Sequence, residues 1–86
     1  MKLYLNDHCA VEKDDIVGFF DMDTATVAPG TREFLRLSER EGRTSVTTGD
    51  IPVSFAVTRD KKNKIFIYFT RNAPKVLRRR VESNRI

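Results

Sequence analysis

The stretch IVGFFDMDT (residues 16–24) determines the expected fold and raises the first question about function. Its first five residues are apolar or glycine, with no alternation between apolar and polar types. Such a run is typical of a strand that is covered on both faces or lies centrally in a sheet. The run ends in Asp-x-Asp-Thr, whose short polar side chains can bond to nearby backbone groups. We therefore expect a buried strand followed directly by a turn or a helix start.

The two aspartates also have the spacing of a phosphatase nucleophile and its acid/base partner, as in enzymes of the haloacid-dehalogenase type. Asp21 would then attack a phosphate, with Asp23 as acid/base and Mg²⁺ between them. A chain of 86 residues is too short for the large parallel sheet and the later Lys and acidic residues of such an enzyme. We therefore expect no enzyme activity and no cofactor. We expect Asp21, Asp23 and Thr24 to fix the strand-to-helix connection, with Asp23 or Thr24 bonding backbone N–H groups there.

Composition excludes several other classes of protein. One cysteine, Cys9, and one histidine, His8, cannot provide an internal disulfide or a tetrahedral metal site. No apolar run approaches the roughly 18 residues of a membrane span, and the N-terminus lacks a secretory signal. We expect a cytoplasmic protein that makes no membrane contact.

The remaining pattern predicts one α+β domain over residues 1–86: a small, mostly antiparallel sheet of about six strands with two helices, one central and one C-terminal. Pro29 suits the first turn of the central helix, and Gly42 is its expected stop. Asn72 is expected to cap the C-terminal helix, which begins a basic helix or tail at about residue 72. The expected strands lie within residues 2–5, 9–11, 16–20, 44–48, 53–58 and 65–70.

Two of these strands have informative apolar patterns. In residues 53–58 a strict period of two predicts Val53, Phe55 and Val57 inside and the residues between them outside. In residues 65–70 both faces are apolar, and one small core can cover only one of them. Phe66 and Tyr68 therefore form a candidate contact between subunits, the alternative being that the C-terminal helix covers them.

Charge is segregated along the chain. Residues 1–58 carry a net charge of −4, and residues 59–86 carry +8. Such segregation favours a surface that binds an anion or an acidic partner. The candidate nucleic-acid contacts form two clusters, a hairpin loop and the C-terminal helix: Arg59, Lys61, Lys62, Lys64 and Arg71 in the first, and Lys75, Arg78, Arg79 and Arg80 in the second. Three consecutive arginines span most of a helix circumference, which favours phosphate contacts over base readout.

Several blocks along the chain resemble one family. DIVGFFDMDTATV, then TREFLRLSEREG, a hydrophilic hairpin, P-x-SF-x-VT and a basic C-terminus are similar to the bacterial extracellular matrix regulators of the RemA/RemB type, in particular the RemB-like branch. The resemblance covers residues 1 to about 80. It implies a ring-forming homo-oligomer that binds duplex DNA and regulates matrix (biofilm) genes, and it also suggests a RemA-type regulator as a possible partner.

The sequence departs from this family where RemA-like members carry phosphate-binding arginines. The corresponding stretches read GDIPVS (residues 49–54) and EKDDI (residues 12–16), so that Asp50, Asp14 and Asp15 have the opposite charge. None of those arginines can be transferred to this chain. Two hypotheses follow: a homo-oligomeric DNA-binding regulator that contacts phosphates through residues 59–86, or an interaction module or oligomeric scaffold that does not itself bind DNA.

Overall fold

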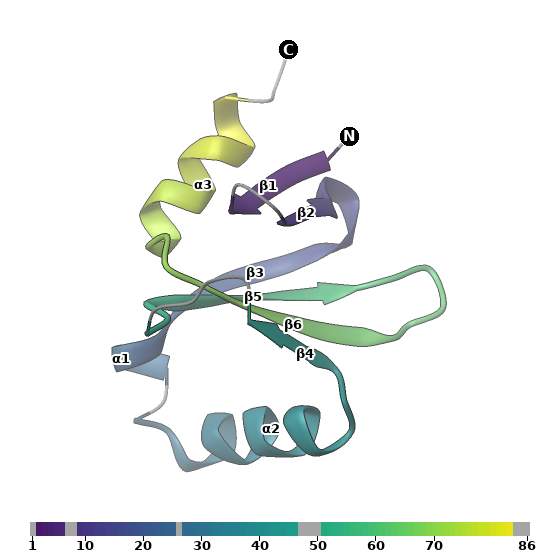
Figure 1. The fold of residues 1–86 in the computed structure, drawn as a ribbon, viewed down its shortest axis with the longest axis vertical. Helices are drawn as coiled ribbons and strands as arrows, with labels where there is room; N and C mark the ends of the chain where they lie inside the picture. The colour runs from purple at the N-terminus through teal and green to yellow at the C-terminus, as the bar shows by residue number, and fades with distance from the viewer. Residues whose placement is uncertain (1, 7–8, 26, 47–50, 84–86) are drawn as a thin grey trace.

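The computed structural model describes residues 2–6, 9–25, 27–46 and 51–83. Two sheets and three α-helices form an α+β fold within this part of the chain. Figure 1 shows the elements, which are β1 (Lys2–Asn6), β2 (Cys9–Glu12), the 3₁₀ turn η1 (Lys13–Asp15), β3 (Ile16–Asp21), α1 (Met22–Ala25), α2 (Pro29–Arg40), β4 (Thr44–Val46), β5 (Ser54–Arg59), β6 (Ile65–Thr70) and α3 (Pro74–Ser83).

The predicted strands exist, but they form two sheets instead of one. β1 and β2 make an antiparallel hairpin, and the other four strands have the order β3-β5-β6-β4. β4 pairs parallel to β6, so the larger sheet is mixed and not wholly antiparallel. The third helix is the four-residue α1, which the prediction of two helices omitted. Alternation along a strand indicates which residues share a face, but it does not indicate which strands pair or in which direction.

Three layers result, with the four-stranded sheet in the middle (Figure 1). On one side α2 packs against the sheet around Leu35, Phe55, Val57 and Ile67. On the other side the β1–β2 hairpin and α3 enclose a second cluster, formed by Leu3, Leu5, Val11, Phe19, Ala56 and Leu77. We call this second cluster the hairpin core.

The predicted alternation in β5 is only partly right: Phe55 and Val57 are buried as expected, but Val53, predicted inside, is 43% exposed. Ser54, Phe55, Ala56, Val57 and Thr58 are all buried, because β5 lies between β3 and β6 and both of its faces are covered. The small residues Ser54 and Ala56 leave room for the hairpin layer. A short strand in which small or polar residues alternate with large apolar ones can therefore lie at the centre of the sheet.

The opposite error concerns β3, whose continuous apolar run predicted a covered or central position. β3 is an edge strand, and Val17 and Phe20 are 59% and 41% exposed. Its pairing with β5 also shifts register between Ile16 and Gly18, so Val17 is the extra residue of a β-bulge. The apolar side chains of β3 are therefore only partly buried within one subunit.

Asp21 ends β3 and starts α1. Its Oδ1 accepts hydrogen bonds from the backbone N–H groups of Asp23 (2.8 Å) and Thr24 (3.3 Å). This is the geometry of an N-cap side chain, which satisfies amide groups at a helix start. The expected local bonding is present, and among the described residues Asp21 supplies it instead of Asp23 or Thr24.

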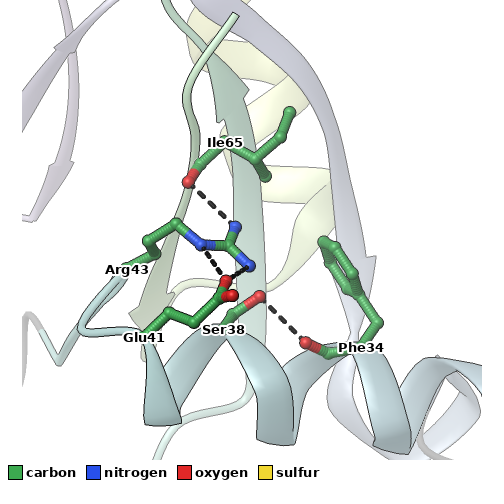
Figure 2. A network of polar contacts seen from close by, with 5 residues as sticks. All are labelled: Phe34, Ser38, Glu41, Arg43 and Ile65. Atoms are coloured by element: carbon green, nitrogen blue, oxygen red, sulfur yellow. Dashed lines mark hydrogen bonds and ion pairs between the residues drawn. The ribbon is translucent and has the colours of Figure 1, made fainter.

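The end of α2 is fixed to the sheet by a polar network around Arg43 (Figure 2). Gly42 follows the helix with φ of +73°, the left-handed conformation that glycine adopts without strain, so the predicted stop is confirmed. Arg43 Nε donates to Glu41 Oε1 at 2.8 Å, and its Nη1 donates to the carbonyl of Ile65 at 3.2 Å. Within the helix, Ser38 Oγ donates to the carbonyl of Phe34 at 2.8 Å.

One carbonyl of the N-terminal hairpin accepts two hydrogen bonds from the C-terminal third of the chain. The oxygen of Leu5 accepts from Thr70 Oγ1 at 3.1 Å and from Asn72 Nδ2 at 2.7 Å. The prediction that Asn72 caps α3 is wrong, because the helix begins at Pro74 and Ala73 is the residue before it. At the start of α3 the N–H groups of Val76 and Leu77 bond to the carbonyl of Ala73.

Candidate nucleic-acid interface

The C-terminal helix separates its apolar and cationic residues on opposite sides. Leu77 is fully buried in the hairpin core, and Val81 packs against the same cluster. At about 100° per residue, Lys75, Arg78 and Arg79 fall within an arc of about 100° that also contains the exposed Glu82, with Arg78 at the edge nearest Val81. All three side chains are exposed. We call these three residues the outer face of α3.

Arg80, which was predicted with this cluster, lies elsewhere. Its Nη1 donates to the carbonyl of Tyr4 at 3.0 Å, so it links α3 to strand β1. Arg78 also approaches the backbone, with Nη2 3.5 Å from the carbonyl oxygen of Phe19. In the described part of the chain, neither Lys75 nor Arg79 has an ion pair or hydrogen bond through its side chain. The two are therefore available to an external anion.

The second predicted cluster is a well-defined hairpin loop between β5 and β6. Arg59, Lys61, Lys62 and Lys64 are all exposed there. The loop is organised by Asp60, whose Oδ1 accepts from the N–H groups of Lys64 (2.9 Å) and Lys62 (2.8 Å). The hydrogen bond from Lys64, followed by that from Lys62 and the charges of both lysines, lowers the pKa of Asp60.

Acidic residues adjoin this loop. Lys61 and Lys62 share one depression of about 460 Å³ with the four carboxylates Glu12, Asp14, Asp15 and Asp60. Opposite charges at such close range reduce the local positive potential. Asp14 and Asp15, which stand where RemA-like proteins carry phosphate-binding arginines, thus lie beside the basic loop predicted to contact phosphates here. Asp50 lies outside the described residues.

The two basic clusters do not form one surface within a subunit. The hairpin loop precedes β6, and α3 follows its far end, so a six-residue strand of about 20 Å separates them. Figure 1 shows the loop at one end of the sheet and the start of α3 at the other. Arg71 is exposed near the α3 end.

The predicted subunit contact, Phe66 and Tyr68, is partly covered within one subunit. Phe66 and Tyr68 are each half-buried, and their ring centroids are 4.9 Å apart. Tyr68 packs against the hairpin core, which includes Leu77 of α3. Burial, with smaller effects from Cys9 and Asp15, raises the pKa of Tyr68. The helix alternative therefore accounts for part of this face, and the subunit contact stays a prediction.

A feature that the sequence did not reveal lies along β3. Residues 13, 14 and 16–20 line a depression of about 640 Å³ together with Arg78, Val81 and Glu82 of α3. We call it the β3–α3 cleft. Only the strand order places β3 at an edge, so no sequence signal available in a single chain could have located this cleft.

No family model matches the chain, and no curated protein matches it either. In the described ranges, no helix combines the length and apolar character that spanning a bilayer requires.

Proposed function

We propose that this chain is a homo-oligomeric regulatory protein that binds duplex DNA through phosphate contacts. In this proposal it acts in the cytoplasm, without cofactor or catalysis, in the manner of the extracellular matrix regulators that its sequence resembles. The outer face of α3 carries the proposal. Lys75, Arg78 and Arg79 are exposed on one side of a helix whose other side is held in the hairpin core.

The proposed contact depends on the charge and spacing of the DNA phosphates and not on base sequence. Lysine and arginine side chains on an exposed helix face suit phosphate oxygens, which fix position but carry no sequence information. The only aromatic rings in the C-terminal third lie in β6 and not on α3, which argues against a stacking platform for single strands. Binding of this kind is strongly weakened by salt, because each neutralised phosphate releases condensed counterions.

Self-association multiplies a contact that is weak in one subunit. Three cations give little affinity, whereas two or more copies on one assembly present six or more to the same duplex. The half-buried pair Phe66 and Tyr68 is the proposed contact between copies. Phe66→Asp tests it, because Tyr68 has the larger share in the hairpin core. A fall in mass by light scattering supports the contact, and an unchanged mass removes it.

Charge reversal tests the DNA interface. The double variant Arg78→Glu with Arg79→Glu should abolish retardation of duplex DNA at about 50 mM salt without changing the mass of the protein. Lys61→Glu with Lys62→Glu is the matched control, with the same change of charge at the other end of β6. It should have a smaller effect, because Asp14, Asp15 and Asp60 already offset those lysines. Equal retardation by the parent and the α3 double variant would refute the proposal.

The acidic surroundings of the hairpin loop favour a second candidate, an interaction module that does not itself bind DNA. In this case a basic surface of the protein meets an acidic protein or a RemA-type regulator. Co-elution with such a regulator, together with no retardation of duplex DNA by the parent protein, would select this candidate.

A further inference from the structure

Strand β3 has an open edge with regular geometry over a short length. It is the outermost strand of the four-stranded sheet, and its pairing with β5 is regular from Gly18 to Asp21. In an antiparallel pair the backbone groups of alternate residues point away from the partner strand. The carbonyl of Phe19 is one of these, because Met22 N–H bonds to the carbonyl of Val53 at 2.9 Å and the register then leaves residues 19 and 21 pointing outward. This carbonyl accepts from Arg78 Nη2 at 3.5 Å.

Helix α3 stands beside this edge and completes a cleft. The β3–α3 cleft is bounded by β3 on one side and by Arg78, Val81 and Glu82 on the other. Beyond Arg78 the depression continues along Phe19 and Phe20 to the start of α3, where Lys75 lies. An edge strand faced by a helix across a groove is one arrangement in which an extended peptide is bound by strand addition.

The exposed apolar side chains and the charged residues of the cleft indicate the chemistry of its ligand. Val17 and Phe20 leave a large part of their apolar surface exposed along it. The Lys75 and Arg78 end is cationic, although Asp21 also lies there, with one carboxylate oxygen occupied by the α1 amides. At the other end Asp14 and Glu82 accompany Lys13. The cleft therefore has an apolar middle and one end suited to a carboxylate.

We propose that the β3–α3 cleft binds an extended acidic peptide of a partner protein, which adds to the edge of β3 as a fifth strand. An amide N–H of the peptide replaces Arg78 on the carbonyl of Phe19. The released guanidinium then binds a carboxylate of the peptide, which is a stronger acceptor than a carbonyl. In the exchange one long hydrogen bond is lost and two are formed.

The edge favours a peptide over a second copy of this chain. The bulge at Val17 limits the regular edge to four residues, which suits a short segment and hinders continuous pairing of two sheets. An antiparallel pair of β3 strands would also bring together the two copies of Arg78, one from each subunit, across the same edge. An acidic segment meets no such repulsion.

The experiment uses a fluorescein-labelled hexapeptide of alternating valine and glutamate, with fluorescence anisotropy as the readout. Two control peptides are matched in length: one alternates valine and lysine, and one keeps the glutamates but carries N-methyl groups on alternate amides. Arg78→Glu is the test variant of the protein. Arg79→Glu, on the neighbouring residue and outside the cleft, is its control.

The proposal expects saturable binding of the glutamate peptide, weakened about tenfold or more by Arg78→Glu, since a charge-assisted bond is lost. Arg79→Glu should change binding by less than about twofold. N-methylation should also weaken it about tenfold, because strand addition needs the amide N–H groups. Amide signals of residues 17–20 should shift on binding, and those of residues 61–64 should not.

Absence of saturable binding at millimolar peptide would overturn the proposal. So would equal binding of the N-methylated peptide, or equal loss in Arg78→Glu and Arg79→Glu, which would indicate general attraction to a cationic helix. A doubled mass without peptide that returns to one subunit in Val17→Lys would assign the edge to a second copy. None of these outcomes depends on DNA, so this proposal and the proposed function can fail separately.

Discussion

The salt dependence of DNA binding measures how many cations of the proposed interface contact phosphates. The outer face of α3 supplies three, Lys75, Arg78 and Arg79. Since each neutralised phosphate contributes about −0.9 to the slope of log K against log salt, one subunit should give a slope of about −2.7 and two subunits about −5.4. Between about 50 and 200 mM salt, affinity should then fall about 40-fold for one subunit or about 2,000-fold for two.

Removing one charge gives the number of contacting subunits from the change in slope, without use of the absolute slope. Arg79→Gln should reduce the magnitude of the slope by about 0.9 for every subunit in contact with the duplex. The change therefore gives the number of subunits, which light scattering of the complex checks. Arg40→Gln, at an exposed arginine of α2 far from α3 in sequence, removes the same charge and should leave the slope unchanged.

The assay is anisotropy of a labelled duplex, measured at several salt concentrations for the parent and both variants. A parent slope smaller in magnitude than about 1 would exclude a three-cation contact. An Arg79→Gln slope equal to that of the parent would remove α3 from the interface, whatever the affinity. Either result would refute the reasoning.

Three further predictions concern stability. Leu77→Ala should lower the free energy of unfolding in urea by about 2–5 kcal/mol, because it leaves a cavity in the hairpin core, whereas the exposed Val76→Ala should cost less than about 1 kcal/mol. Asp21→Ala should cost about 1 kcal/mol in the same assay through loss of the α1 cap. Asp23→Ala should cost less than about 0.5 kcal/mol, because the Asp23 side chain accepts no hydrogen bond from the part of the chain that the structure describes. The raised pKa of Tyr68 means that the folded state holds the phenol proton more tightly, so this stabilisation is present below pH 10 and is lost as pH rises through the folded pKa. Melting temperatures should accordingly fall as pH rises above about 10 in the parent, and fall less in Tyr68→Phe; an equal fall would exclude this origin.

Local patterns in the sequence predicted local structure well. Pro29 begins α2, Gly42 follows its end in the left-handed conformation, and the hairpin loop joins β5 to β6 as expected. Each of these depends on the chemistry of a few adjacent residues. The proline ring and the glycine backbone limit the chain in the same way wherever the element lies in the fold.

Positions within the sheet were predicted poorly, for a physical reason. β3 is rich in apolar residues yet lies at an edge, and β5 alternates yet lies at the centre. Burial of a strand depends on its neighbours in space, and α2 and the hairpin supply cover that no local window contains. The separation of the two basic clusters follows from the same limitation, because it depends on the direction of β6. The β3–α3 cleft was missed for this reason as well.

The carbonyl of Leu5 connects the beginning of the chain to its end. Its two donors, Thr70 and Asn72, follow it by 65 and 67 residues. During synthesis the ribosome releases this hairpin long before these donors exist, and the apolar side of the hairpin stays partly uncovered until Leu77 of α3 emerges. Ordering of the N-terminal strands should therefore be among the last events of folding, and a chain shortened before residue 70 should leave them susceptible to proteases.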